Sequence, residues 1–515
     1  MPAGNPWLIA VAVTLAAFME VLDTTIVNVA LPHISGTMSV SYDEATWALT
    51  SYLVANSIVL PISAYLARTF GRKRYFLACI VGFTICSFLC GISTNLTELI
   101  LFRILQGLFG GGLQPNQQSI ILDTFPASRR GAAFSVTAVA TVVAPVLGPT
   151  LGGWITDNFT WRWVFLINVP IGILTTFAVM SLVEDPPWVK KNEGKASTDF
   201  VGIGLIALGF GALQIMLDRG EDADWFGSGS IIAAGCVAAI GLSGAVAWLF
   251  YTDRPVVNLR VLGDRNFALG SLTISAFAMI LYGSAVLIPQ LAQQHLGYTA
   301  TLSGLVLSPG ALCIIAIIPI ISRVMPYVQT RLILTLGFFL LGCAMLYSRN
   351  ITADIDFRHL VMLRAAQSVA IGFLFVPAST LAYLTVPRNL QGDATALFTM
   401  FRNIAGSIGI SLSTAAIMTR TQAHMVFLAG HMSPTDPGYV DYLARTTAAI
   451  KSYSLVVGNA AQAATGRLYQ ETIAQAGLLA YMDVFFYCAL IAFAFIPFTL
   501  LFSPAKAAGG AGEAA

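Results

Sequence analysis

Residues 18–32 read FMEVLDTTIVNVALP, and they lie within the first long apolar run of a 515-residue chain. The stretch carries two carboxylates, Glu20 and Asp23. A charged side chain at the centre of a membrane costs about 3 kcal/mol or more, so such residues usually have a function. Because the two acids are three positions apart, they share one face of a helix. The stretch therefore predicts a membrane helix whose acidic face binds and releases protons.

Composition indicates that the whole chain is a membrane protein. Hydrophobic residues make up 57% of the sequence and charged residues only 10%, whereas a soluble domain averages about 25% charged residues. Apolar runs of about 20 residues recur from end to end, and each can cross a bilayer as a helix. The seven cysteines and five histidines show no metal-ligand spacing, so neither a metal nor another cofactor is expected. The sequence predicts an all-α, polytopic membrane protein.

Fourteen transmembrane helices are expected from these apolar runs. Their approximate ranges are 8–31, 46–67, 75–93, 98–122, 131–156, 163–183, 200–218, 229–251, 267–292, 302–325, 331–349, 359–385, 394–419 and 479–502. More than half of the 27 Lys and Arg residues fall in loops after even-numbered spans. Positively charged loops face the cytoplasm, so both chain ends are expected on the cytoplasmic side.

An internal repeat relates the two ends of the chain. At an offset of 261 positions, Arg103 and Gln106 recur as Arg364 and Gln367, and three downstream glycines and one proline match as well. Two copies in the same membrane orientation are typical of transporters with parallel six-helix halves. We expect an N-terminal six-helix bundle, two inserted helices, a C-terminal six-helix bundle and a disordered tail at residues 1–190, 191–255, 256–505 and 506–515, respectively.

One outer connection, at about 420–478, is much longer than the others. The sequence SPTDP at 433–437 breaks any helix there, while the Ala- and Gln-rich stretch 460–478 is compatible with a helix. Long unstructured connections are uncommon in compact domains. Two interpretations stay open, a flexible insertion and a surface that docks another protein on the outer face.

The fourth and fifth spans contain residues that suggest moving parts. Arg103 lies in an apolar stretch and needs an acidic or carbonyl partner, for which Glu20 and Asp23 are the candidates. Such a pair either only fixes helix packing or breaks when the acid is protonated. The fifth span has residues that bend a helix and let a neighbour approach closely. These residues are Pro145, Gly148, Pro149, Gly152 and Gly153.

The inner loop after the second span contains Gly71, Arg72 and Lys73. Its basic residues either set the membrane topology alone or also bridge helix ends and stabilise one conformation.

The chain resembles the fourteen-helix drug:proton antiporter branch of the major facilitator superfamily, and within it the EmrB-type pumps. The resemblance rests on LDTTIVNVALP at 22–32, GRK at 71–73, RILQG at 103–107, PVLGPTLGG at 145–153 and WRWVFLINVPIG at 161–172. The EmrB-type likeness rests on LQIMLDRG at 213–220, DWF at 224–226 and the long last outer connection. Together these motifs cover nearly the whole chain.

The resemblance implies a major facilitator fold and proton-coupled efflux of hydrophobic or amphipathic molecules, such as drugs, by alternating access. It implies proton coupling through Asp23 and Arg103, with Asp23 ranked first because it belongs to the family motif. Glu20 is not part of that motif and is ranked below Asp23, as a residue that tunes Asp23 or contacts substrate. It also implies a multi-pass protein of a Gram-negative inner membrane that works with a periplasmic adaptor and an outer-membrane channel. Nucleic acid is not an expected partner. Helix position alone suggests a substrate cavity lined by Asn56, Gln114, Gln117, Gln290 and Phe401.

Two features depart from the family pattern. Arg68 stands where the inner-loop motif has an Asp, and Thr69 replaces a basic residue. The contact by which that Asp stabilises one conformation in the family is therefore not expected here. The tenth span, 302–325, has no acidic residue, so no preference for divalent cations is inferred.

Other functions remain as alternatives. An exporter of one metabolite, fatty acid or siderophore would use a similar cavity, while a passive facilitator would not need acids paired with a buried arginine. An ATP-driven pump or a membrane enzyme is not expected, because the chain has neither a G-x-x-x-x-G-K-[ST] loop nor a Ser/His/Asp set.

Overall fold

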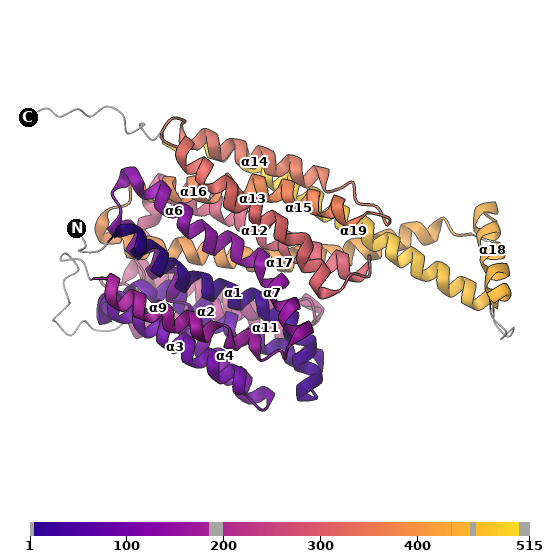
Figure 1. The fold of residues 1–515 in the computed structure, drawn as a ribbon, viewed down its shortest axis with the longest axis horizontal. Coiled ribbons are helices and arrows are strands. Elements are labelled where there is room, and N and C mark those ends of the chain that lie inside the picture. Colours follow the sequence, from indigo (N-terminus) through magenta and orange to yellow (C-terminus); the bar gives the residue numbers. More distant parts are fainter. Residues whose placement is uncertain (1–4, 185–198, 434, 454–459, 504–515) are drawn as a thin grey trace, which may run out of the picture.

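The computed structural model describes residues 5–184, 199–433, 435–453 and 460–503, and all regular structure within them is helical. Long helices run side by side along one axis (Figure 1). The helix α1 (Pro6–Met38) begins, and α19 (Ala460–Leu500) ends, at the same end of this bundle, which we call the termini end. The helix α18 (Pro437–Tyr453) projects beyond the opposite end, which we call the α18 end.

The N-terminal half contains α1 and five further helical segments. These are α2 (Tyr42–Phe70), α3 (Arg72–Ile92), α4 with α5 (Leu96–Gly110, Leu113–Thr124), α6 with η2 and α7 (Arg130–Ala138, Val139–Val143, Ala144–Asn158), and α8 with α9 (Trp163–Leu166, Asn168–Leu182), with the turn η1 (Ala127–Arg129) before α6. Glycines let α4 lie directly on α2, since a Cβ on Gly107 would come within 2.8 Å of the Ala55 Cβ. This close packing brings Arg103 of α4 against α1 and α2.

The inserted helices α10 (Phe200–Arg219) and α11 (Gly229–Tyr251) pack on each other through small residues, with the turn η3 (Trp225–Gly227) between them. A Cβ on Gly241 would lie 2.6 Å from the backbone nitrogen of Gly209. Helix α10 also contacts α2 and α17 (Gln391–Gly430), where Gln214 Nε2 donates to Ser407 Oγ over 3.2 Å. The inserted pair therefore reaches the junction of the halves through α10. The expected domain boundary between residues 190 and 191 lies outside the described residues.

The C-terminal half repeats the arrangement with longer final helices. Its elements are α12 (Arg265–Gln294), α13 (Ala300–Val324), α14 (Thr330–Tyr347), α15 with α16 (Phe357–Gly372, Phe375–Ala382), α17, α18 and α19, with the turns η4 (Leu259–Gly263) and η5 (Arg388–Leu390). In Figure 1 these elements, coloured red to yellow, lie beside the indigo-to-magenta N-terminal half.

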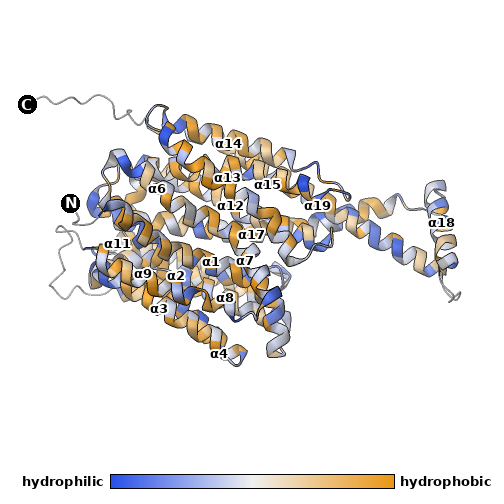
Figure 2. Cartoon of the chain, in the orientation of Figure 1, coloured by the Kyte–Doolittle hydropathy of each residue, from blue (hydrophilic) through white to orange (hydrophobic). Residues whose placement is uncertain are grey.

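The chain is a multi-pass membrane protein. Thirteen helical stretches among the described residues are long and apolar enough to cross a bilayer. Helix α17, which contains the expected span 394–419, is not one of them. It carries Arg402 and Asn403 and packs against α2, α5, α12 and α19, so much of its surface meets protein instead of lipid. Figure 2 shows apolar residues predominating along the bundle and polar residues on α18.

The long connection expected at about 420–478 is helical over most of its described length. Helix α17 continues to Gly430 and α19 already starts at Ala460, so both extend beyond the bundle at the α18 end (Figure 1). Between them, the break expected at 433–437 falls between the end of α17 and the start of α18. These described residues form helices instead of an irregular loop, as the high helix propensity of the Ala- and Gln-rich stretch favours. The expected disordered tail, 506–515, lies outside the described residues.

Close packing of α7 on α1 gives a first prediction. A Cβ on Gly148 would lie 2.8 Å from the Thr25 Cβ, so Gly148→Ala forces α7 away from α1. Overpacking of this kind typically costs about 1–3 kcal/mol. We expect a lower Tm for the purified variant in a thermal-shift assay. The control is Gly204→Ala in α10, where a Cβ meets no heavy atom within 4 Å. Equal Tm values for the two variants would contradict the packing argument.

Candidate functional site

A cavity of about 640 Å³ lies between the two halves. Its wall comes mainly from α1, α2, α5, α7, α10, α12 and α17. It reaches from the exposed Tyr42 and Gln294 near the α18 end to Leu60 and Gln114 deep in the bundle. A cavity of this volume fits a drug-sized molecule.

At the termini end the two halves are in contact. Arg68 Nη1, at the end of α2, donates to Asp393 Oδ2, at the start of α17, over 2.7 Å. Nearby, Tyr383 OH donates to Gln118 Oε1 over 2.8 Å. These contacts close the space between the halves on this side. The structure therefore represents a state that is open toward the α18 end and closed at the termini end.

Asp23 is completely buried and does not line the cavity. Arg103 Nη1 donates to its Oδ2 over 2.6 Å. Gln106 Nε2 and Asn168 Nδ2 donate to its Oδ1 over 3.1 and 2.8 Å. Three donors, one of them cationic, occupy most of the acceptor positions of a carboxylate. Asp23 is thus the centre of a sealed polar cluster contributed by α1, α4 and α9.

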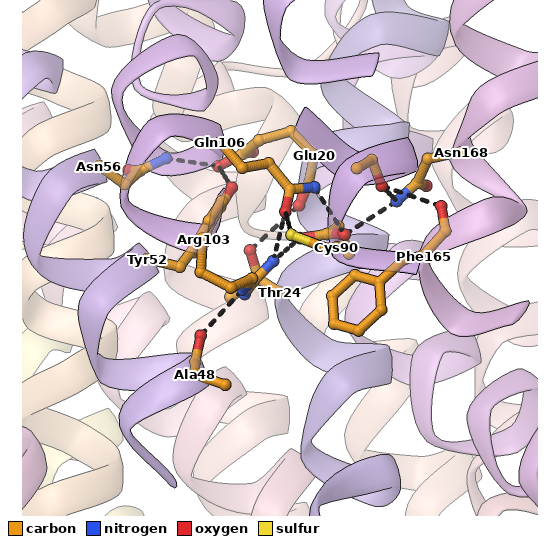
Figure 3. Close-up of polar contacts among 12 residues, drawn as sticks. Glu20, Thr24, Ala48, Tyr52, Asn56, Cys90, Arg103, Gln106, Phe165 and Asn168 are labelled. Carbon is orange, nitrogen blue, oxygen red and sulfur yellow. Dashed lines mark hydrogen bonds and ion pairs between the residues drawn. The ribbon is translucent and has the colours of Figure 1, made fainter. Parts of the chain in front are cut away.

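Arg103 is equally buried, and its surroundings include aromatic rings as well as Asp23. Its Nε donates to the carbonyl oxygen of Ala48 over 2.8 Å. Its Cζ lies 4.1 Å from the centroid of the Tyr52 ring and 5.6 Å from that of Phe165. Cation–π contacts of this kind are strongest when the cation is desolvated. Of the two acids considered as partners of Arg103, Asp23 forms the ion pair. Glu20 instead accepts hydrogen bonds from other residues, among them Asn56 (Figure 3).

Glu20 lies in the cavity wall, although its side chain is almost fully buried. Its Oε1 accepts hydrogen bonds from Asn56 Nδ2 over 3.0 Å and Tyr52 OH over 3.3 Å. Its Oε2 accepts from Gln114 Nε2. Tyr52 thus touches both sites, with its ring on Arg103 and its hydroxyl on Glu20 (Figure 3). The two acids share a helix face but occupy separate polar environments.

Arg402 of α17 was not among the residues expected in the site. This side chain is fully buried, and its Nη2 donates to Gln114 Oε1 while Gln114 Nε2 donates to Glu20. Gln114 therefore connects α1 of one half with α17 of the other. The sequence did contain an indication of its importance, because Arg402 is a charged residue inside an expected membrane span, as Arg103 is.

Two further acids come from the inserted segment and also line the cavity. Asp218 accepts a hydrogen bond from Thr50 Oγ1 of α2, and the neighbouring Arg219 pairs with Asp43 over 2.8 Å. Burial and the adjacent Asp222 raise the pKa of Glu221 to about 7. The described lining of the cavity contains no Lys or Arg. Its mouth is therefore acidic.

The fifth-span motif lies between the two halves. Pro145 and Pro149 line the cavity, and Gly153 is buried. Gly152 faces α1, where a Cβ would lie 2.9 Å from the Ile26 carbonyl oxygen. On the other side of α7, Thr150 Oγ1 donates to the Gly304 carbonyl oxygen of α13 over 2.6 Å. A π-helical turn precedes α7, at the position where Pro145 cannot donate a backbone hydrogen bond.

The inner-loop residues connect helix ends within the N-terminal half. Gly71 has φ 86°, a conformation that favours glycine. Arg72 donates to Ser119 Oγ over 2.9 Å and also pairs with Asp123, both of α5. Lys73 Nζ donates to the Met180 carbonyl oxygen of α9 over 2.8 Å.

Five residues had been expected in the cavity wall, and the structure places only some of them there. Asn56, Gln114 and Gln290 line the cavity, whereas Gln117 and Phe401 do not. Gln117 instead donates to Thr137 Oγ1 over 2.8 Å and to Thr14 Oγ1 over 3.3 Å, and Phe401 packs against the hydrophobic core. Their expected positions were wrong because helix position does not fix which face of a helix meets the cavity. The described residues contain no cluster of three or more side chains suited to a metal ion.

Comparisons with known proteins agree on one family. Residues 13–410 match the model of the Major Facilitator Superfamily. The chain is 39% identical to the multidrug export protein EmrB of Haemophilus influenzae, with 84% of each chain covered. It is 34% identical to the fatty acid resistance protein FarB of Neisseria gonorrhoeae, with 99% of this chain and 98% of that protein covered. A solved structure of a bacterial homologue of the lysosomal transporter Spinster, inward-facing and unoccupied, superposes with a TM-score of 0.54 at 17% identity, covering 98% of this chain and 100% of that one.

The ion pair at the termini end gives a second prediction. Removing Arg68 leaves the Asp393 carboxylate, only 3% exposed, without its cation, whereas removing Asp393 leaves Arg68, 40% exposed, in contact with water. Unpaired buried charges are costly and solvated ones are not. We therefore expect Arg68→Ala to shift the population away from the observed state more than Asp393→Asn does.

A single cysteine at Ile410, which lines the cavity, can report this shift through its labelling rate with a membrane-impermeant maleimide in a background without the native cysteines. We expect slower labelling in Arg68→Ala and recovery in the exchanged pair Arg68→Asp with Asp393→Arg. Unchanged labelling in both single variants would show that the pair does not stabilise this state.

Proposed function

The chain belongs to the Major Facilitator Superfamily, and on that premise we propose that it exports amphipathic small molecules, drugs among them, by proton-driven alternating access. Family membership confirms the resemblance seen in the motifs and the predicted major facilitator fold. The single observation that carries the proposal is the cavity between the halves, with the carboxylate of Glu20 in its wall and the Asp23–Arg103 pair directly behind it. Relatives named as multidrug export proteins support it. We propose transport, with no enzymatic activity.

The charge of the cavity supports neutral or cationic substrates. Its lining contains the carboxylates of Glu20, Asp218 and Glu221 and, among the described residues, no basic side chain other than His33. An organic cation is attracted to such a lining, while a fatty-acid anion is repelled. Fatty-acid export is the second candidate, favoured by the relative named for fatty acid resistance. A dedicated metabolite or siderophore exporter has no comparable support.

Proton coupling is proposed to begin at Glu20. Because Glu20 lines the cavity, protons that enter from the α18 end reach it first. Protonation removes the negative charge that its hydrogen bond with Gln114 places near Arg402 of the other half. Protonation of Asp23 would then weaken its pairing with Arg103. The expected ranking of Asp23 ahead of Glu20 becomes a proposal of two acids that act in sequence.

The movement itself is proposed to take place where α7 packs between α1 and α13. Small residues on α7 let both neighbours approach closely, so the contact can slide without large side chains interlocking. Opening at the termini end requires the Arg68–Asp393 pair to separate. Gly71, Arg72 and Lys73 would move with the N-terminal half, because they tie α2 and α3 to α5 and α9.

The termini end is proposed to face the cytoplasm. Arg68, Arg72, Lys73 and Arg388 all lie at this end, as the positive-inside rule requires of the cytoplasmic side. The cavity would then open to the periplasm of a Gram-negative inner membrane. This direction fits a pump that releases substrate outward.

A periplasmic adaptor and, through it, an outer-membrane channel are the proposed partners. The α17–α18–α19 projection extends beyond the bundle at the α18 end (Figure 1). It exposes Val426, Phe427, Val440 and Tyr469, whose side chains are 76%, 62%, 49% and 56% exposed. Exposed apolar residues outside the membrane commonly mark protein contacts.

The transport proposal is tested with inverted membrane vesicles that accumulate a lipophilic cation when a proton gradient is applied. We expect gradient-dependent uptake by the wild type, none by Asp23→Asn, and weakened pH dependence in Glu20→Gln, because these changes remove the two carboxylates proposed to carry protons. The control is Asp253→Asn, an exposed acid outside the site. Oleate serves as the anionic comparison.

Two results would count against this mechanism. Full uphill transport by Asp23→Asn would rule out coupling through this acid, and wild-type uptake that a protonophore does not abolish would indicate a passive facilitator. Export of oleate without export of the cation would favour the fatty-acid candidate.

The adaptor proposal is tested by co-purification of the full chain with a candidate periplasmic adaptor from the same organism. We expect Val426→Asp with Phe427→Asp to lose the adaptor, because charges replace an apolar contact. Tyr327→Asp is the matched control, since Tyr327 is 88% exposed near the termini end. Equal recovery of the adaptor by both proteins would exclude this part of the projection from the interface.

A further inference from the structure

The C-terminal half contains a second copy of the buried arginine cluster. Ser284 lies 261 positions after Asp23, which is the offset that relates Arg103 to Arg364. Arg103 Nη1 donates to Asp23 Oδ2 over 2.6 Å, and Arg364 Nη1 donates to Ser284 Oγ over 3.0 Å. The following glutamines match as well, since Gln106 and Gln367 accept from these arginines over 2.9 and 3.2 Å. The copies differ in their acceptors, because Arg103 meets a carboxylate and its Nε donates to the Ala48 carbonyl oxygen, whereas Arg364 meets a hydroxyl.

Arg364 consequently has no counter-charge among the described residues. Its side chain is fully buried, and its Nε and Nη2 have no hydrogen-bond acceptor there. The hydroxyl of Ser368, one helical turn later and also fully buried, has no partner either. An uncompensated guanidinium inside a membrane protein costs several kcal/mol, on the order of a charged residue in hydrocarbon.

The Ser368 side chain and the aliphatic part of Arg364 lie on one face of α15, toward α13, while the Arg364 guanidinium reaches Ser284 of α12. A Cβ on Gly310 of α13 would lie 3.2 Å from the Arg364 Cγ and 3.3 Å from the Ser368 Cβ. Neither side chain lines the central cavity. A substrate in that cavity therefore does not supply the missing charge, and the occupant must be small enough to sit among packed helices.

We propose that Arg364 and Ser368, beside Ser284, bind a small monovalent anion of the halide class, such as chloride. The donors available are guanidinium N–H groups and a hydroxyl, which suit an ion that only accepts hydrogen bonds. One negative charge balances one arginine, as Asp23 does for Arg103. A carboxylate can be protonated, whereas a halide ion cannot be at physiological pH. The two halves therefore carry the same cluster, of which only the N-terminal copy responds to protons.

The proposal is tested with the purified full-length protein in detergent, by measuring Tm in sodium chloride and in sodium gluconate at equal ionic strength. A ligand that binds only the folded state raises the Tm, and we expect chloride to raise that of the wild type by about 3 °C or more. Ser284→Asp places a carboxylate where Asp23 has one, so its Tm should be high in both salts and insensitive to chloride. Arg364→Gln should lose the chloride response.

Ser271→Asp is the matched control, because Ser271 is a buried serine of the same helix, α12, whose hydroxyl has no partner among the described residues. It should lower the Tm and retain the chloride response. The proposal is overturned if the wild type has the same Tm in both salts, or if Arg364→Gln keeps the full response. If Arg364→Gln does not fold, an undiminished response in Ser284→Asp overturns it instead.

Discussion

The pair formed by Asp23 and Arg103 is the interaction on which the N-terminal half depends. Two opposite charges lie inside a bundle that crosses a bilayer, and neither has access to water. Their burial is tolerable only with further polar contacts, and amide groups of α4 and α9 donate to Asp23 while a carbonyl oxygen of α2 accepts from Arg103. The positions of three helices relative to α1, namely α2, α4 and α9, are thereby tied to one carboxylate and its arginine. Loss or gain of a proton there changes a contact that all of them share.

The second acid of α1 extends this influence to the other half of the molecule. Glu20 faces the cavity, and Gln114 links it to Arg402 of α17. Tyr52 contacts Arg103 with its ring and Glu20 with its hydroxyl group. A substrate and a proton can thus compete for the same small set of hydrogen bonds. Some of these bonds also join the two halves, so the same competition affects their relative position. Competition of this kind is the physical requirement for coupling, because a ligand shifts a conformational equilibrium only through differential interactions with its states.

Charge placement also explains a departure from the family pattern. Where the inner-loop motif has an acid, this chain has Arg68, and the partner in the opposite half is the acid Asp393. In this chain a charged contact between the halves at the termini end thus has Arg68 as its basic member. The C-terminal copy of the buried cluster shows the opposite outcome, since Ser284 has replaced the acid and the arginine has remained. At the termini end a basic residue thus faces an acid in the other half, whereas in the C-terminal cluster Arg364 faces a hydroxyl and lacks an acid among the described residues.

The sequence by itself determined the membrane class, the repeat, the family motifs and the identity of the acids and of Arg103, because apolar runs and charges within them are local properties of the chain. It also indicated that 460–478 is compatible with a helix and that SPTDP breaks one. Tertiary structure alone decided that Asp23 and not Glu20 pairs with Arg103, that Arg402 connects to Glu20 through Gln114, and that Gln117 and Phe401 lie outside the cavity wall. These outcomes depend on the rotation of each helix and on its neighbours. A helix with hydrophobic residues on every side carries little periodic signal about which face meets protein, lipid or cavity.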